Sequence, residues 1–286
     1  MVLSYGCSSG ALAAHTTSAP ATTAVTTTMP ATTSTTTKPA RESRVVVWGD
    51  SLTLQAADAL KVQGRAHGFA LTVHAFFGLA PCDVAPQIFP TLERNPPDAI
   101  VLAFTGNNFS PCMAQNGKPM TGGPYFATYR RDIEHLVAVA SAHHVRVLVV
   151  GAPAFPAKEN HPDRVELNAI YKQISATRPG VSYASTAPAV SPLGFADRVA
   201  CIAGETAALG CSDGFITVRT GNGIHFDDPH AVACPSASRS SDQCRYTAGG
   251  HRFAIAIIAG LEKAGGLSYH PASPTVGVPI DTTEDG

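Results

Sequence analysis

The sequence predicts a three-layer α/β fold, in which a mostly parallel five-stranded sheet is covered by helices on both faces. Two observations predict this class. Short apolar runs of the buried-strand type alternate with amphipathic helical segments between residues 43 and 266. Hydrophobic residues also make up 44% of the chain and charged residues only 14%, so the chain can fill a sizeable core. A single α/β domain over residues 43–266 is therefore expected.

Five segments carry the strand pattern. The first contains Val45, Val46 and Val47 and is stopped at Gly49, and the third follows a turn signal of asparagine and two prolines at residues 95–97. The predicted strands span residues 44–48, 69–76, 98–104, 145–150 and 181–184.

Helical periodicity fills the intervals between most of these strands. In the longest helical segment, apolar side chains recur on one face at Tyr129, Ile133, Val137 and Ala140. The predicted helices span residues 51–64, 125–143, 163–177 and 247–264. Residues 187–246 are expected to be mostly loop, and residues 267–286 a polar tail.

The charge balance excludes some classes of partner. Lysine and arginine number 20 against 21 acidic residues, and no basic run occurs, so no nucleic-acid partner is expected. No uncharged apolar run reaches the roughly 18 residues of a membrane span. We expect a monomer whose partner is a small-molecule or envelope substrate.

Cysteine usage bears on the cellular compartment. None of the seven cysteines has a Cys-x-x-Cys spacing, so neither a zinc site nor any other metal is expected. Six cysteines lie as local pairs in loop-like sequence, which favours disulfides and an extracytoplasmic protein, although six cysteines allow 15 pairings. The local pairs are Cys82 and Cys112, Cys201 and Cys211, and Cys234 and Cys244.

The first 42 residues indicate targeting rather than fold. Residues 16–40 are rich in threonine and proline and poor in large apolar side chains, which is typical of a flexible linker. Before them, Gly6 and Cys7 are similar to the end of a bacterial lipoprotein signal. Two interpretations stand: a lipidated Cys7 that would tether the chain to a membrane, or an incidental cysteine in a damaged signal peptide.

A serine stands at the first strand-to-helix junction, in the order Gly49, Asp50, Ser51, Leu52. A hydroxyl there lies at the carboxyl edge of a parallel sheet, where open α/β folds bind ligands. The helix N-terminus also supplies amide donors for a developing oxyanion. Taken alone, Ser51 is better explained as an N-cap.

Further residues at the strand ends complete a recognisable order. Gly78 follows the second strand, Gly106 and Asn108 follow the third, and His225 comes late in the chain. Together with Ser51 they resemble the SGNH/GDSL hydrolase family over about residues 44–264. The resemblance implies a flavodoxin-like SGNH-hydrolase fold and an ester hydrolase that needs no cofactor.

The resemblance also implies roles. Ser51 would be the nucleophile and His225 the base that takes its proton. The Ser51 amide, the Gly78 amide and the Asn108 side chain would form the oxyanion hole. By the same resemblance, a Cys82–Cys112 disulfide would tie together the loops that carry Gly78 and Asn108.

One position departs from the family pattern, since Asn222 stands where the family has an aspartate three residues before the histidine. Three interpretations remain open. His225 is oriented by Asn222 or by a backbone carbonyl, or Asp227 or Asp228 supplies the carboxylate, or the active histidine is His230, which follows Asp227 by three residues. The match of several positions around His225 favours the first.

The expected function is hydrolysis of O-acyl groups of a carbohydrate or lipid through an acyl-serine, outside the cytoplasm. An O-acyltransferase using the same site is a close alternative, because only the acceptor differs. A non-catalytic SGNH-like glycan-binding module is an alternative of another class, and Asn222 is the feature that suggests it.

Overall fold

The structure is a computed structural model that describes residues 42–156, 161–219, 221–226 and 247–264. Several expectations lie outside these residues: lipidation of Cys7, the pairing of Cys234 with Cys244, the alternative acid and base residues Asp227, Asp228 and His230, and the C-terminal tail.

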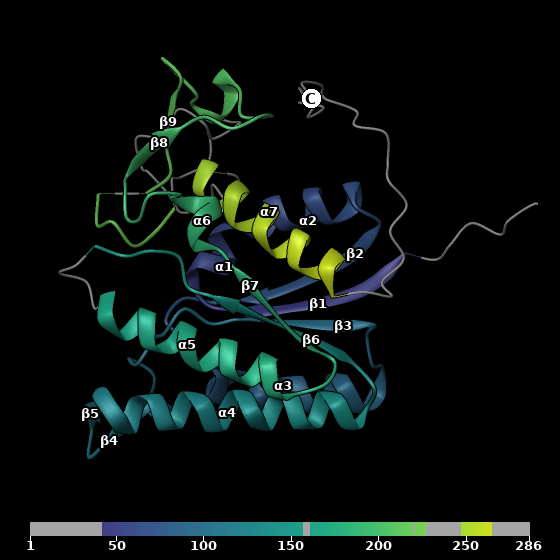
Figure 1. The fold of residues 1–286 in the computed structure, drawn as a ribbon. Helices are drawn as coiled ribbons and strands as arrows, with labels where there is room; N and C mark the ends of the chain where they lie inside the picture. Colours follow the sequence, from purple (N-terminus) through teal and green to yellow (C-terminus); the bar gives the residue numbers. More distant parts are fainter. Residues whose placement is uncertain (1–41, 157–160, 220, 227–246, 265–286) are drawn as a thin grey trace, which may run out of the picture. The chain divides into compact units, whose positions relative to one another are not determined.

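A five-stranded parallel sheet forms the centre of the fold, with the strand order β2-β1-β3-β6-β7 (Figure 1). All five predicted strands are present, and the predicted fold class is confirmed. The strands are β1 Ser43–Gly49, β2 Phe69–Ala75, β3 Ala99–Ala103, β6 Arg146–Gly151 and β7 Val181–Ser185.

Helices cover both faces of this sheet (Figure 1). One face carries α1 Ser51–Gln55, α2 Ala57–Ala66, α6 Ala187–Val190 and α7 Ala248–Lys263. The other carries α3 Pro81–Arg94, α4 Gly122–Ala142 and α5 His161–Thr177.

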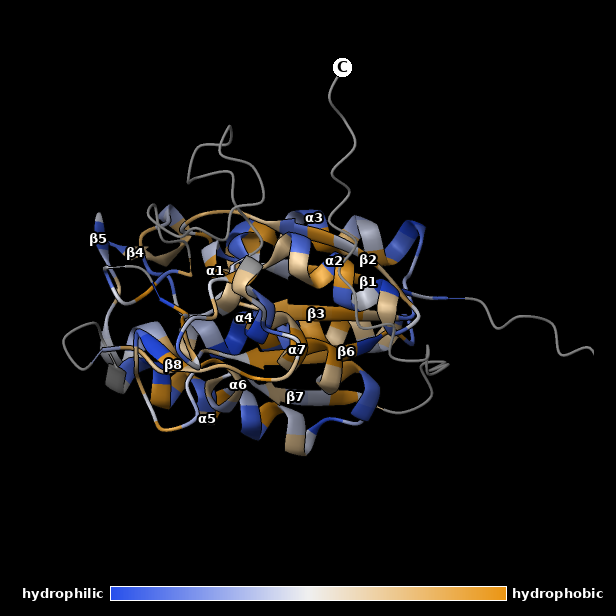
Figure 2. Cartoon of the chain, turned by 90° about the horizontal axis from the view of Figure 1, so that it is seen from above, coloured by the Kyte–Doolittle hydropathy of each residue, from blue (hydrophilic) through white to orange (hydrophobic). Residues whose placement is uncertain are grey.

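Alternating side chains of β1 divide the core into two layers. Val45 and Val47 pack in the cluster that includes α7, and Val46 and Trp48 pack in the cluster that includes α4. Both faces of the central strands are thus buried, and Figure 2 shows β3 and β6 in the colour of hydrophobic residues.

The structure contains one long helix that the periodicity analysis did not predict, α3. Proline opens this helix at Pro81, where a missing N–H costs nothing, but Pro86 and Pro90 lie inside it. Each interior proline removes a backbone donor, so sequence-based analysis disfavours a helix there. Tertiary packing overrides that preference because one side of α3 is fully buried, at Val84, Ile88 and Leu92.

The predicted helix 51–64 is divided in two. Ala56, at φ −93° and ψ 1°, separates α1 from α2 and still belongs to the buried core. The break leaves α1 as a short element at the end of β1, directly at the edge where the serine lies.

The predicted loop region contains a small antiparallel hairpin, β8 Arg198–Ala200 with β9 Phe215–Thr217. A disulfide joins Cys201 to Cys211 inside it. Glu205 of the hairpin loop and Arg252 of α7 form a fully buried ion pair at 2.6 Å. This pair joins the hairpin to α7. A second small hairpin, β4 Ala114–Gln115 with β5 Lys118–Pro119, precedes α4.

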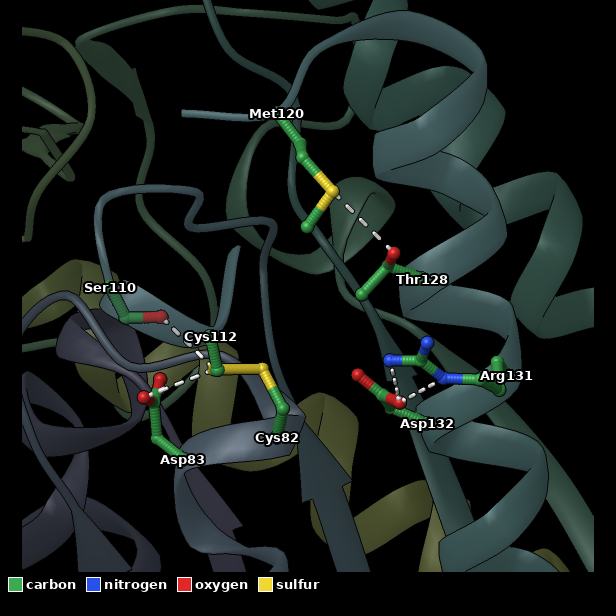
Figure 3. Close-up of polar contacts among 8 residues, drawn as sticks. All are labelled: Cys82, Asp83, Ser110, Cys112, Met120, Thr128, Arg131 and Asp132. Carbon is green, nitrogen blue, oxygen red and sulfur yellow. Dashed lines mark hydrogen bonds and ion pairs between the residues drawn. A yellow bond between two sulfur atoms is a disulfide. The ribbon is translucent and has the colours of Figure 1, made fainter. Parts of the chain in front are cut away.

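A second disulfide joins Cys82, at the start of α3, to Cys112, which follows β3 (Figure 3). This is the pair of cysteines that the family resemblance implied. Within the described part of the chain, no helix is long and apolar enough to cross a membrane.

Removing the Cys82–Cys112 bond should lower the free energy of unfolding. The bond closes a sequence separation of 30 residues, which on the chain-entropy model stabilises the native state by about 3 to 4 kcal/mol. Urea unfolding of the Cys82→Ala/Cys112→Ala double variant measures this loss. Mass spectrometry of an unreduced digest that contains no 82–112 cross-link would contradict the assignment.

Candidate active site

Ser51 lies where strand β1 ends and helix α1 begins. The strand ends at Gly49, where any Cβ would collide with the side chain of Thr53 and the carbonyl oxygen of Ala103. Thr53 donates its hydroxyl to that carbonyl at 3.0 Å, which holds the turn against β3. Asp50 caps α1, so Ser51 is the first helical residue, and it is only 7% exposed. Its hydroxyl therefore lies at the carboxyl edge of the sheet.

Asp50 joins the serine turn to the loop that follows β3. Its Oδ1 accepts the backbone N–H of Leu52 at 3.2 Å. Its Oδ2 accepts both the N–H and the hydroxyl of Thr105 at 2.6 Å and the side-chain amide of Asn107 at 3.1 Å. Burial raises the pKa of the Asp50 carboxyl, and the donors from Thr105 and Leu52 oppose that rise. The fully buried carboxylate thus links the turn after β1 to the loop after β3 and fixes their relative positions.

The two consecutive asparagines after β3 have different partners. Asn107 directs its side-chain amide to Asp50 and to the carbonyl of Leu79 at 3.2 Å, so both of its amide hydrogens serve the frame of the site. Asn108 donates to the carbonyl of Met120 at 2.9 Å, which uses one of its two amide hydrogens. This difference favours Asn108 as the asparagine that can offer an N–H to an oxyanion.

Gly78 lies in the loop between β2 and α3, with φ at +73°. This is a left-handed backbone conformation that suits glycine. The rings of its neighbour Phe77 and of His225 lie in a T-shaped arrangement, with the ring centroids 6.5 Å apart. The loop that carries Gly78 therefore borders the site.

His225 comes from the far end of the chain and meets the serine. Its Nε2 lies 3.3 Å from Ser51 Oγ, across a sequence separation of 174 residues. Gln55 of α1 accepts the backbone N–H of Phe226 at 3.0 Å. The buried guanidinium of Arg219 donates to the carbonyl of Ile224 at 2.6 Å. The residues on either side of His225 are therefore both held in place.

Arg219 also affects the charge state of the histidine. Burial lowers the pKa of His225, and the positive charge of Arg219 lowers it further. Burial lowers the pKa of Arg219 itself to about 10, so this side chain stays charged at neutral pH. Both effects favour the neutral imidazole of His225.

Asn222 lies on the side of His225 that faces away from Ser51, so the three side chains form a row. Its Nδ2 lies 2.9 Å from His225 Nδ1. Its Oδ1 accepts the backbone N–H groups of Ile224 at 2.8 Å and His225 at 3.1 Å. The structure thus brings Ser51, His225 and Asn222 together in the order that the sequence predicted.

Among the described residues, one group has the side-chain spacing of a metal site: Cys82, Asp83 and Cys112. Figure 3 shows that the two sulfur atoms are bonded to each other, with Asp83 and Ser110 beside them. Sulfur in a disulfide is not the thiolate that binds metal ions. This group is therefore a cross-link rather than a metal site.

Three residues that build the site have no role predicted from the sequence: Asp50, Gln55 and Arg219. Asp50 stands inside the quoted Gly-Asp-Ser-Leu motif, and its position directly after a buried strand was the available signal. Arg219 stands six residues before His225 in the sequence, but its burial between Phe155 and Phe226 depends on tertiary packing.

Residues 44–229 match the model of a family described as "Protein of unknown function (DUF459)". The chain belongs to this family. No curated protein matches the sequence.

A solved structure shows the fold of this DUF459 protein. A lipase/acylhydrolase from Enterococcus faecalis superposes with a TM-score of 0.51 at 16% identity, covering 80% of this chain and 100% of that one. The C-terminal catalytic domain of peptidoglycan O-acetyltransferase A from Streptococcus pneumoniae has a TM-score of 0.49 at 15% identity, covering 80% and 98%. The likeness to the Enterococcus faecalis structure confirms the predicted fold.

Replacing Asp50 should loosen the frame of the site. In Asp50→Asn an amide NH₂ replaces one carboxylate oxygen and faces backbone and side-chain donors, so we expect a loss of about 1.5 to 3 kcal/mol in the free energy of unfolding. Chemical denaturation measures it. The control Asp58→Asn, on the surface of α2, should change stability by less than about 0.5 kcal/mol. Equal stability of Asp50→Asn and Asp58→Asn would contradict the role given to Asp50.

Proposed function

We propose that this DUF459 protein is a serine ester hydrolase that works through an acyl-serine on Ser51. The observation that carries the proposal is the 3.3 Å contact between Ser51 Oγ and His225 Nε2 at the N-terminus of α1. Nucleophile–base contacts of this length tighten when substrate binds. The buried Asp50 network supports the proposal, because it holds the serine turn rigidly against the loop of Asn108.

The proposed reaction has two halves. Ser51 Oγ bonds to the ester carbonyl carbon while its proton passes to His225 Nε2, and the carbonyl oxygen becomes an oxyanion. N–H groups of Ser51, Gly78 and Asn108 donate to that oxyanion. Its collapse breaks the bond to the leaving alcohol, which takes the proton from His225. Water then adds to the acyl-serine with His225 again as the base, releasing the acid and free Ser51.

We place the scissile ester on an O-acylated carbohydrate or lipid. Phe77, next to Gly78, is 59% exposed, and Phe109, next to Asn108, is 79% exposed. Phe76 is exposed as well. Exposed aromatic side chains on the two loops of the proposed oxyanion hole support a substrate that presents an apolar face.

We place the reaction outside the cytoplasm. Two disulfides among the described residues, Cys82–Cys112 and Cys201–Cys211, support this compartment, because disulfides persist in oxidising surroundings. A lipidated Cys7 would hold a monomeric hydrolase at the membrane surface by the linker that follows it.

Ser51→Ala should abolish ester turnover and leave the fold intact, because it removes one hydroxyl at the sheet edge. Initial rates on p-nitrophenyl esters of increasing acyl length measure the loss and rank the acyl preference. Ser141→Ala, on the exposed end of α4, is the matched control and should keep full activity. A Ser51→Ala variant with normal circular dichroism and most of its activity would refute the nucleophile.

The value of kcat/KM should rise with pH as His225 loses its proton. Burial and the charge of Arg219 both lower the pKa of His225, and its other described neighbours Ser51 and Asn222 are neutral. The rising limb should therefore lie below the ordinary histidine value of 6.5. A rate profile between about pH 4.5 and 8 measures it. A rising limb of the kcat/KM profile that is centred above pH 6.5 would contradict the environment described for His225.

A further inference from the structure

The side-chain amide of Asn222 has a defined orientation. Two backbone N–H groups, those of Ile224 and His225, meet one atom of this side chain at 2.8 and 3.1 Å. A backbone N–H only donates, so the atom that both meet is the amide oxygen. The NH₂ group consequently faces His225, 2.9 Å from Nδ1.

This orientation decides which nitrogen of His225 carries the proton. An amide NH₂ only donates, so Nδ1 must accept. A neutral imidazole has one N–H, which is then on Nε2. That N–H points to Ser51 Oγ, and a protonated Nε2 is unable to take the proton of the serine.

We propose that Asn222 is a positioning residue that holds His225 in the Nε2–H tautomer and thereby keeps the resting site slow. The inference rests on the proposed ester hydrolysis. Ser51 becomes nucleophilic only when the imidazole proton has moved to Nδ1, which requires the contact with the Asn222 amide to break. A carboxylate at position 222 would accept the same two backbone N–H groups and the Nδ1–H together.

Rotating the Asn222 side-chain amide would turn its oxygen toward His225 Nδ1, but the rotation would break other hydrogen bonds. The rotated NH₂ would face the N–H groups of Ile224 and His225, and two hydrogen bonds would be lost. Asn222 is exposed to solvent, so water partly replaces what rotation breaks. We therefore expect a slowing of about 10- to 100-fold, below the roughly 10⁴-fold effect of an asparagine in the buried triad of a serine protease.

Nitrogen NMR of the whole protein tests the tautomer directly. In a sample labelled with ¹⁵N-histidine, long-range ¹H–¹⁵N correlations at about pH 8 distinguish a protonated from an unprotonated ring nitrogen, and a His225→Gln variant assigns the signal. The expected result is an unprotonated Nδ1 and a protonated Nε2 in the wild type. A protonated Nδ1 in the wild type would overturn the proposal.

Asn222→Asp tests the consequence for the rate. The variant should move the proton to Nδ1 and raise kcat about 10- to 100-fold on a p-nitrophenyl ester. Asn116→Asp makes the same chemical change at an exposed turn with φ of 53°, which aspartate also adopts, and should leave the rate unchanged. A folded Asn222→Asp protein whose His225 keeps the wild-type tautomer would overturn the proposal. If the wild type is active, an Asn222→Asp protein that has the proton on Nδ1 but no higher rate would also overturn it.

The two proposals fail in different ways. If neither the wild type nor Asn222→Asp turns over any ester, the proposed function is wrong, while a wild-type Nε2–H signal still supports the tautomer assigned to His225. If the wild type hydrolyses esters with Nδ1 protonated, the proposed function stands and the role of Asn222 is wrong.

Discussion

The candidate site depends on one buried carboxylate, that of Asp50. Removing a carboxylate from water is costly unless donors compensate, and here two strand ends supply them through Leu52, Thr105 and Asn107. Because Asp50 precedes Ser51, and Asn107 precedes Asn108, the same network sets the places of the proposed nucleophile and of one proposed oxyanion donor. The serine turn and the asparagine loop therefore cannot shift independently.

The histidine side of the site is built differently. His225 comes from a segment outside the sheet, so it needs its own restraints. Arg219 provides them by donating to Ile224 and, at 2.9 Å, to the carbonyl of Ala154 in the segment after β6. Its charge also lowers the pKa of His225 and favours the neutral ring. One buried arginine thus restrains the segment that carries His225 and favours the neutral form of the His225 ring.

Much of the fold could be predicted from local sequence, because the strands are short buried runs such as Val45–Val47 with turn signals at their ends. Helix α3 could not, since Pro86 and Pro90 oppose a helix and only tertiary burial of Ile88 and its neighbours compensates. The order of Ser51, Asn222 and His225 was predictable from motif spacing. The direction of the Asn222 amide was not, because it depends on backbone N–H groups whose positions only the folded loop defines.

The central claim is that Ser51 is the nucleophile and His225 its base, and its most direct test is covalent labelling. The protein is incubated with a fluorophosphonate, digested and mapped by mass spectrometry, with His225→Gln treated in parallel. The account predicts one adduct, on Ser51, formed far more slowly in His225→Gln. Labelling of Ser51 at the same rate in both proteins, or an adduct on another residue only, would contradict it.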